Sequence, residues 1–71
     1  MKLTLTLDAA PAGVRAALAE EWEEIGRSVR MEPMVRLFDT EEQAIAWGRA
    51  LAGRRRLSRI YLIDHRKSVR R

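Results

Sequence analysis

The chain has 71 residues, of which 34% are charged, a net charge of +4 at pH 7, no cysteine and a single histidine. This length suits one small domain with a thin core, and it excludes a second domain or a large substrate cleft. The missing cysteines exclude disulfides, zinc–thiolate sites and thiol catalysis. The longest strongly apolar run, Ile60 to Ile63, is far shorter than the roughly 20 residues that a bilayer requires.

The charges divide unevenly along the chain. Residues 1–48 carry five basic and nine acidic side chains, a net charge of −4, whereas residues 49–71 carry nine basic side chains against one acidic, a net charge of +8. Such a basic end attracts phosphate backbones, acidic proteins or anionic lipid headgroups. Arginine is also abundant in the products of GC-rich genomes, but that bias would scatter the residues. Their clustering favours a functional basic surface over a merely solvated end.

The first part of the chain predicts a strand followed by a helix. Residues 2–7 alternate between leucine and polar side chains, which is typical of a strand with one buried face. Asp8 can act as an N-cap, and Pro11 is tolerated in a first helical turn. Apolar residues then recur at spacings of three and four over residues 14–29. Gly26 would end this helix.

The segment after this helix leaves two interpretations open. Residues 34–38 predict a strand, with Val35 and Leu37 facing one way, and Pro33 suits the first residue of a strand or an edge. Residues 27–31 are either a loop or a short strand of their own.

A second helix is the clearest local prediction. Thr40 and Gln43 have the spacing of a capping box, and acidic residues fill the first turn, where the helix dipole favours them. Gly53 supplies a stop. Gly48 lies on the apolar face of this helix, where we expect a close approach to the sheet or to the first helix.

The last strand and the tail complete the chain. Residues 57–63 are apolar on both faces, which predicts a central strand. Residues 65–71 form a basic C-terminal tail, either frayed or paired as a short hairpin partner. We expect residues 1–64 to form the single domain. No signal peptide is recognisable at the start, so we expect a cytoplasmic protein.

The element order β-α-β-α-β predicts an α/β two-layer sandwich, in which two helices cover a three-stranded sheet. If residues 27–31 form a strand, the order becomes β-α-β-β-α-β, and an α+β ferredoxin-like fold with an antiparallel sheet is the alternative. In both cases one face of the sheet is open, and Thr4, Thr6, Arg36 and Arg59 are candidates for it.

Residues suited to catalysis are scarce. His65 is the only imidazole and lies in the basic end, and the serines form no nucleophile motif. Neither a metal-ligand spacing nor a glycine-rich phosphate loop is present. We therefore expect no enzymatic activity, no metal and no cofactor.

The aromatic residues point mainly to packing. Trp22 and Trp47 each fall on an apolar helical stripe, which predicts core positions, although either could anchor an interface. Tyr61 follows Arg59 on the last predicted strand, and this is the kind of surface on which a nucleic-acid base stacks.

Residues 35–47 resemble a strand–cap–helix element that recurs in several small bacterial families. The stretch is similar to the helix entry of a short bacterial domain of unknown function, to the corresponding part of SpoIIAA-like proteins, and to the arm-binding domain of phage integrases. The similarity covers about a fifth of the chain. It implies a small bacterial or phage-borne domain, and no functional residue is carried over from it.

These observations predict a small non-enzymatic module whose basic end binds a polyanion, with nucleic acid backbone as the expected partner. The residues expected to contact it are Arg54, Arg55, Arg56, Arg59, Tyr61, Arg66, Lys67, Arg70 and Arg71. The alternative is a protein-interaction module, such as a small regulator or a phage-type inhibitor of a host protein. Its expected contact residues are Glu20, Glu21, Glu23 and Glu24. A homodimer formed by pairing acidic and basic ends is a further possibility.

Overall fold

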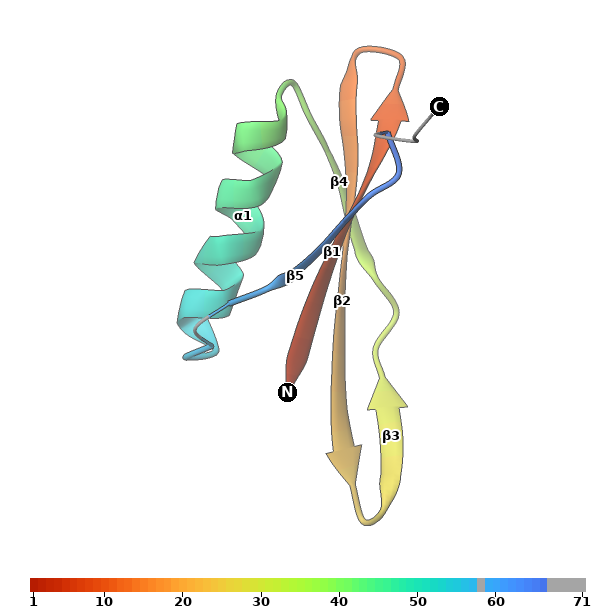
Figure 1. Cartoon of the computed structure of the whole chain (residues 1–71), viewed down its shortest axis with the longest axis vertical. Helices are drawn as coiled ribbons and strands as arrows, with labels where there is room; N and C mark the ends of the chain where they lie inside the picture. The colour runs from red at the N-terminus through yellow and green to blue at the C-terminus, as the bar shows by residue number, and fades with distance from the viewer. Residues whose placement is uncertain (58, 67–71) are drawn as a thin grey trace, which may run out of the picture.

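The computed structural model describes residues 1–57 and 59–66. Within them the chain forms a five-stranded mixed sheet with one helix packed on one face (Figure 1). The elements are β1 (Lys2–Ala10), β2 (Gly13–Glu24), β3 (Arg27–Arg30), β4 (Met34–Phe38), α1 (Glu41–Arg54) and β5 (Tyr61–Asp64). None of the described residues belongs to a helix that is long and apolar enough to cross a membrane.

The long strand β2 organises the sheet. One of its edges pairs antiparallel with β1 over the whole length of β1, and β1 pairs in parallel with β5. The other edge pairs antiparallel with β3 near the end of β2 and with β4 near its start. β3 and β4 therefore lie end to end along the same side of β2. The pairing register shifts by one residue between them, because residues 31–33 form a bulge that precedes β4.

The predicted first helix is wrong, and with it the three-stranded, two-helix sandwich. β2 occupies that segment and reverses tightly at both ends. Pro11 and Ala12 separate β1 from β2, and a Cβ on Gly13 would lie 2.1 Å from the carbonyl oxygen of Phe38. Val14, Ala16 and Leu18 are all buried, so the period that governs this segment is two. The helical spacing and the Ala- and Glu-rich composition were outweighed by the pairing of β2 along both edges.

Two further expectations change with the sheet. Residues 27–30 do form a strand of their own, as the ferredoxin-like alternative required, but that alternative is also wrong because it contains the absent first helix. β5 covers only residues 61–64 and lies at the edge beside β1, rather than at the centre. Its apolar residues remain about half exposed, and Tyr61 and Ile63 among them point to the face opposite α1.

The predicted second helix is confirmed with its cap. The Thr40 hydroxyl accepts a hydrogen bond from the backbone N–H of Gln43, and the Gln43 side chain accepts one from the backbone N–H of Thr40. The close approach at Gly48 is also confirmed. A Cβ at this position would lie 3.2 Å from side-chain atoms of both Leu5 and Ile60, so the missing side chain lets α1 lie close to β1.

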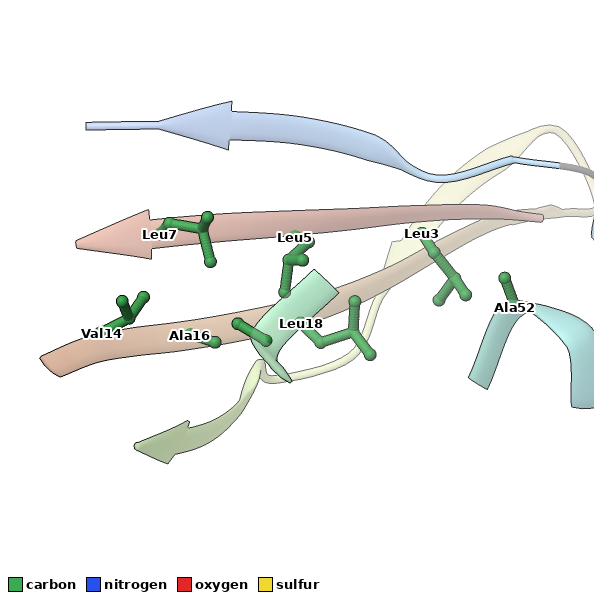
Figure 2. Close-up of a cluster of buried hydrophobic side chains, with 8 residues drawn as sticks. Leu3, Leu5, Leu7, Val14, Ala16, Leu18 and Ala52 are labelled. Atoms are coloured by element: carbon green, nitrogen blue, oxygen red, sulfur yellow. The ribbon is translucent and has the colours of Figure 1, made fainter. Parts of the chain in front are cut away.

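The core lies between α1 and the first two strands. Leu3, Leu5 and Leu7 are fully buried, and Figure 2 shows them with side chains of β2 and α1. The remaining buried members of the cluster are Val14, Ala16, Leu18, Ala44 and Ala52. Phe38 and Trp47 pack at its side with ring centroids 5.5 Å apart, which confirms the core position expected of Trp47. Trp22 lies half-buried on β2, and its Nε1 donates to Glu24 at 2.8 Å.

The turn between β2 and β3 carries unfavourable backbone geometry. Ile25 and Gly26 have φ angles of 46° and 78°, as a two-residue type I′ turn requires. A β-branched residue is poorly suited to positive φ, and the Ile25 side chain is fully exposed, so burial does not offset this strain. The hairpin extends beyond the end of α1 (Figure 1).

Replacing Ile25 by asparagine should therefore stabilise the protein. Asn tolerates positive φ, and the expected gain is about 1 kcal/mol in the free energy of unfolding, measured by urea denaturation. Ile25→Val is the matched control because it keeps the β-branched side chain, and its stability should equal that of the wild type. Equal stability of the Asn and Val variants would contradict this interpretation of the turn.

Candidate polyanion-binding surface

The C-terminal end of α1 presents consecutive arginines on a well-defined helix termination. Arg55 is the C-cap, the Arg56 N–H donates to the Gly53 carbonyl at 3.1 Å, and the Leu57 N–H donates to the Ala52 carbonyl at 2.8 Å. This is the hydrogen-bond pattern of a Schellman motif, in which the residue after the cap adopts positive φ and is usually glycine. Here that residue is Arg56, with a φ of 58°. The helix thus ends later than the predicted stop at Gly53.

Arg55 is held by an ion pair with a buried carboxylate. Its Nη2 donates to Oε1 of Glu20 at 2.9 Å, and its Nε donates to the same oxygen at 3.3 Å. Glu20 lies on β2 opposite Leu3, on the face that α1 covers, and only 7% of its side chain is exposed. A carboxylate buried to this extent needs a cationic partner. Arg55 therefore anchors the end of α1 to the sheet, and its charge is balanced by Glu20.

The neighbouring arginines differ from Arg55 in this respect. Arg49, Arg54, Arg56 and Arg59 are exposed, and no carboxylate lies within ion-pairing distance of any of them in the part of the chain that the structure describes. We call these four residues the arginine surface. It surrounds the last two turns of α1 and the approach to β5.

Two shallow grooves flank this part of α1. The groove on the β5 side has a volume of about 380 Å³ and is lined by Arg49, Ala52, Gly53, Leu57, Arg59 and Ile60. The groove on the β4 side has a volume of about 190 Å³ and is lined by Met34, Arg36, Trp47, Ala50, Leu51 and Arg54. Each groove combines two arginines with an apolar floor. Such a floor suits the sugar or base that accompanies a phosphate.

Arg36 reaches the helix face of the sheet and not the open face that was expected for it. It pairs across from Ala16 on β4, and its guanidinium lies 5.7 Å from the centroid of the Trp47 ring. Neither Arg36 nor Arg49 was among the residues that the sequence led us to expect in contact with a polyanion. The signal for Arg49 was its place on the polar side of the predicted helix near its basic end, whereas the position of Arg36 depends on the pairing of β4 with β2.

Tyr61 lies between two cations on the other face of the sheet. Lys2 Nζ lies 4.7 Å from the centroid of its ring, and the guanidinium of Arg59 lies 5.9 Å from it. Tyr61 pairs with Thr4, so it belongs to the open face together with Thr4 and Thr6, as the sequence predicted for these two threonines. Arg59 contacts Tyr61 on this face and is also a member of the arginine surface.

Arg66 lies at the opposite end of the molecule from the arginine surface. Its guanidinium donates to Asp64 and to Glu41, which lies in the first turn of α1. These hydrogen bonds raise the pKa of Arg66 above its ordinary value, and the bond to Asp64 contributes most. Arg54 lies in the last turn of the same helix, and Arg56 follows its C-cap. The structure therefore places Arg54, Arg56 and Arg59 around the C-terminal end of α1, with Arg54 and Arg59 in different grooves, and separates Arg66 from them. Lys67, Arg70 and Arg71 lie outside the described residues.

The acidic residues of the alternative site do not share a face. They lie on β2 and alternate, so that Glu21 and Glu23 point to the open face while Glu20 and Glu24 point to the other. Glu20 is already paired with Arg55. Of the acidic and basic ends that were expected to pair between two copies, Glu20 and Arg55 pair within one chain.

The possible metal ligands and the single imidazole complete the polar groups of the described residues. No group of three or more potential ligands among His, Cys, Asp and Glu occurs in residues 1–57 and 59–66. His65 Nδ1 lies 2.9 Å from Oδ1 of Asp8, and the His65 backbone N–H donates to the Leu7 carbonyl. These contacts fasten the end of β5 to β1.

No family model matches the chain, and neither a curated protein nor a solved structure matches it. The local similarity of residues 35–47 to small bacterial and phage domains therefore stays a prediction.

Replacing Arg55, which pairs with Glu20, should lower stability more than replacing an exposed arginine. Arg55→Ala leaves the Glu20 carboxylate buried without its partner, and we expect it to lower the free energy of unfolding by about 2 kcal/mol. Arg54→Ala, the matched control, loses no ion pair and should change stability by less than about 0.5 kcal/mol. Equal effects in urea denaturation would show that the pair with Glu20 is not structural.

Proposed function

We propose that this protein is a non-enzymatic module that binds a polyanion, namely the backbone of a nucleic acid, through its arginine surface. Arg54, Arg56 and Arg59 make the main contacts, and Arg49 extends them along α1. The proposal is supported by the exposure of these side chains and by the lack of a carboxylate partner within the described residues.

The observation that carries the proposal is the arginine at position 56. Its φ of 58° is the left-handed conformation, which costs an L-residue other than glycine about 1 kcal/mol or more. The side chain is exposed and makes no ion pair within the described part of the chain that would offset this cost. Strained residues of this kind concentrate at functional positions. An arginine in place of the usual glycine is consistent with a side chain that is used by a ligand.

The mechanism is electrostatic and largely independent of sequence. Guanidinium groups present several donors in a planar fork that matches phosphate oxygens. Each phosphate that is neutralised releases close to one condensed counterion, so affinity falls steeply as salt is added. Each of the two grooves offers two arginines to a bound backbone, Arg49 and Arg59 in one and Arg36 and Arg54 in the other.

The second candidate is a protein-interaction module, which is favoured by a different surface. The face of the sheet that α1 does not cover carries exposed apolar side chains on both edge strands, Val35 and Leu37 on β4 and Tyr61 and Ile63 on β5. Exposed apolar patches of this kind are typical of contacts with proteins.

Neutralising the arginine surface should weaken nucleic-acid binding. We expect Arg54→Gln with Arg56→Gln to lower affinity for a short labelled duplex and to reduce the slope of log affinity against log salt by about two, measured by fluorescence polarisation. Arg27→Gln with Arg30→Gln on β3 changes the net charge equally and is the matched control. If both double variants lose the same affinity, binding follows net charge and the surface is not specific.

Arg56→Gly separates stability from binding at a single position. Glycine relieves the positive φ, so the free energy of unfolding should rise by about 1 kcal/mol, while affinity for the duplex should fall several-fold because one cation is lost. Urea denaturation and polarisation on the same preparation measure both. A variant that is more stable and binds as tightly as the wild type would remove Arg56 from the contact surface.

A further inference from the structure

The open face of the sheet is arranged in rows that cross the strands. The pairing registers place Val35, Ala17, Thr6 and Ile63 in one row and Ala19, Thr4 and Tyr61 in the next. The side chains at the centre are small, and those of Thr4 and Ala19 are already buried within one chain, whereas those on the edge strands are large and about half exposed. These two rows form a neutral band across the middle of the face.

A charged row borders this band on each side. On one side Arg15 on β2 stands beside Asp8 on β1, with 3.8 Å between Nη1 and Oδ2. On the other side Glu21 on β2 stands between Lys2 on β1 and Arg30 on β3. Along β2 the charge thus changes from positive to negative across the band, and along β1 it changes from negative to positive.

This charge pattern is complementary to itself under a two-fold rotation. If the axis lies in the plane of the face and runs across the strands between the two neutral rows, each strand is placed over the same strand of the second copy with its direction reversed. Arg15 then faces Glu21 of the second copy, and Asp8 faces Lys2. An isologous interface requires such self-complementarity, and each pair occurs twice in it.

We propose that a second copy of this chain covers the open face, giving a symmetric dimer with the two sheets packed against each other and the helices outside. The neutral rows meet at the centre, where Thr6 lies over Thr4 of the second copy and Ile63 over Tyr61. Packed sheets lie roughly 10 Å apart, a distance that pairs of long charged side chains in the outer rows can bridge.

The chemistry of the face favours a second copy over a nucleic acid as occupant. Its bordering rows carry both signs of charge, so a polyanion would meet Asp8 and Glu21 as well as Arg15 and Lys2. A neutral centre within a charged rim is the usual composition of a protein interface. Strand and residue spacings give a contact of roughly 20 Å by 20 Å, or about 400 Å² per copy. This is below the area of a standard stable interface, so we expect a weak dimer whose population depends on protein concentration.

This inference goes beyond the proposed nucleic-acid binding and does not rest on it. Arg49, Arg54 and Arg56 lie around the end of α1, on the layer that faces away from the partner, whereas Arg59 lies at the sheet edge beside Tyr61. In the dimer Tyr61 is covered by the second copy and is not a stacking platform. Loss of the dimer therefore leaves Arg54 and Arg56 exposed, and loss of these arginines leaves the dimer intact.

Charge reversal at two positions tests the pairing directly. Sedimentation velocity over a concentration series should show the wild type as a dimer, whereas Arg15→Glu and Glu21→Arg should each reduce the mass by half, since each places like charges across the interface. Mixing the two single variants in equal amounts should restore a dimer, because every cross-interface pair is then of opposite sign. The double variant on one chain should also dimerise.

Matched controls lie off the open face. Arg27→Glu and Glu42→Arg make the same charge changes at exposed positions and should remain dimeric. Circular dichroism checks that each variant is folded, and Ile63→Glu provides a second disruptive change if a charge variant is not. A wild type that stays monomeric throughout the series would overturn the proposal. So would single variants that stay dimeric, or a mixture of the two that stays monomeric.

Discussion

β2 is hydrogen-bonded along both of its edges, and this double pairing determines where the other elements lie. Because β4 occupies one side of β2 and β1 the other, the chain can reach the free edge of β1 only by crossing the sheet. α1 makes that crossing and delivers β5 in parallel to β1. One helix covers the middle of one face, so the core stays small and the opposite face stays uncovered.

The crossing also separates the basic residues that are close in sequence. α1 extends for 14 residues, or about 21 Å at the helical rise, and β5 returns along the sheet in the opposite sense. The arginines before β5 thus collect at one end, and Arg66 after β5 meets the first turn of α1 at the other. Among the arginines at the end of α1, Arg55 pairs with the buried Glu20 and so stabilises the fold, whereas Arg54 and Arg56 are exposed to solvent.

Local signals in the sequence were reliable where they depended on few residues. The alternation in β1, the strand at residues 34–38 and the capping box at Thr40 and Gln43 were predicted correctly. Gly48 also indicated a close contact with the sheet.

The helix predicted for residues 14–24 was wrong because the apolar residues of this segment fit both a helical and an alternating period. Only the pairing partners of β2 decide between the two, and they lie elsewhere in the chain. The turn at Ile25 and Gly26 could not be recognised from the sequence, because a two-residue hairpin turn normally has Asn or Asp before glycine. The open face was foreseen for Thr4 and Thr6, but its charge pattern follows from the register and could not be read from the sequence.

The molecule thus has two separate surfaces, a basic one around the end of α1 and a neutral one, bordered by charges, on the sheet. The most direct test of this division is a nitrogen–proton correlation spectrum of the labelled protein titrated with a short DNA duplex. The account predicts that amides of residues 49–57 shift, progressively less as salt is added, while those of Thr4, Thr6 and Ala17 stay in place. Shifts centred on these three residues, or none around the end of α1, would contradict it.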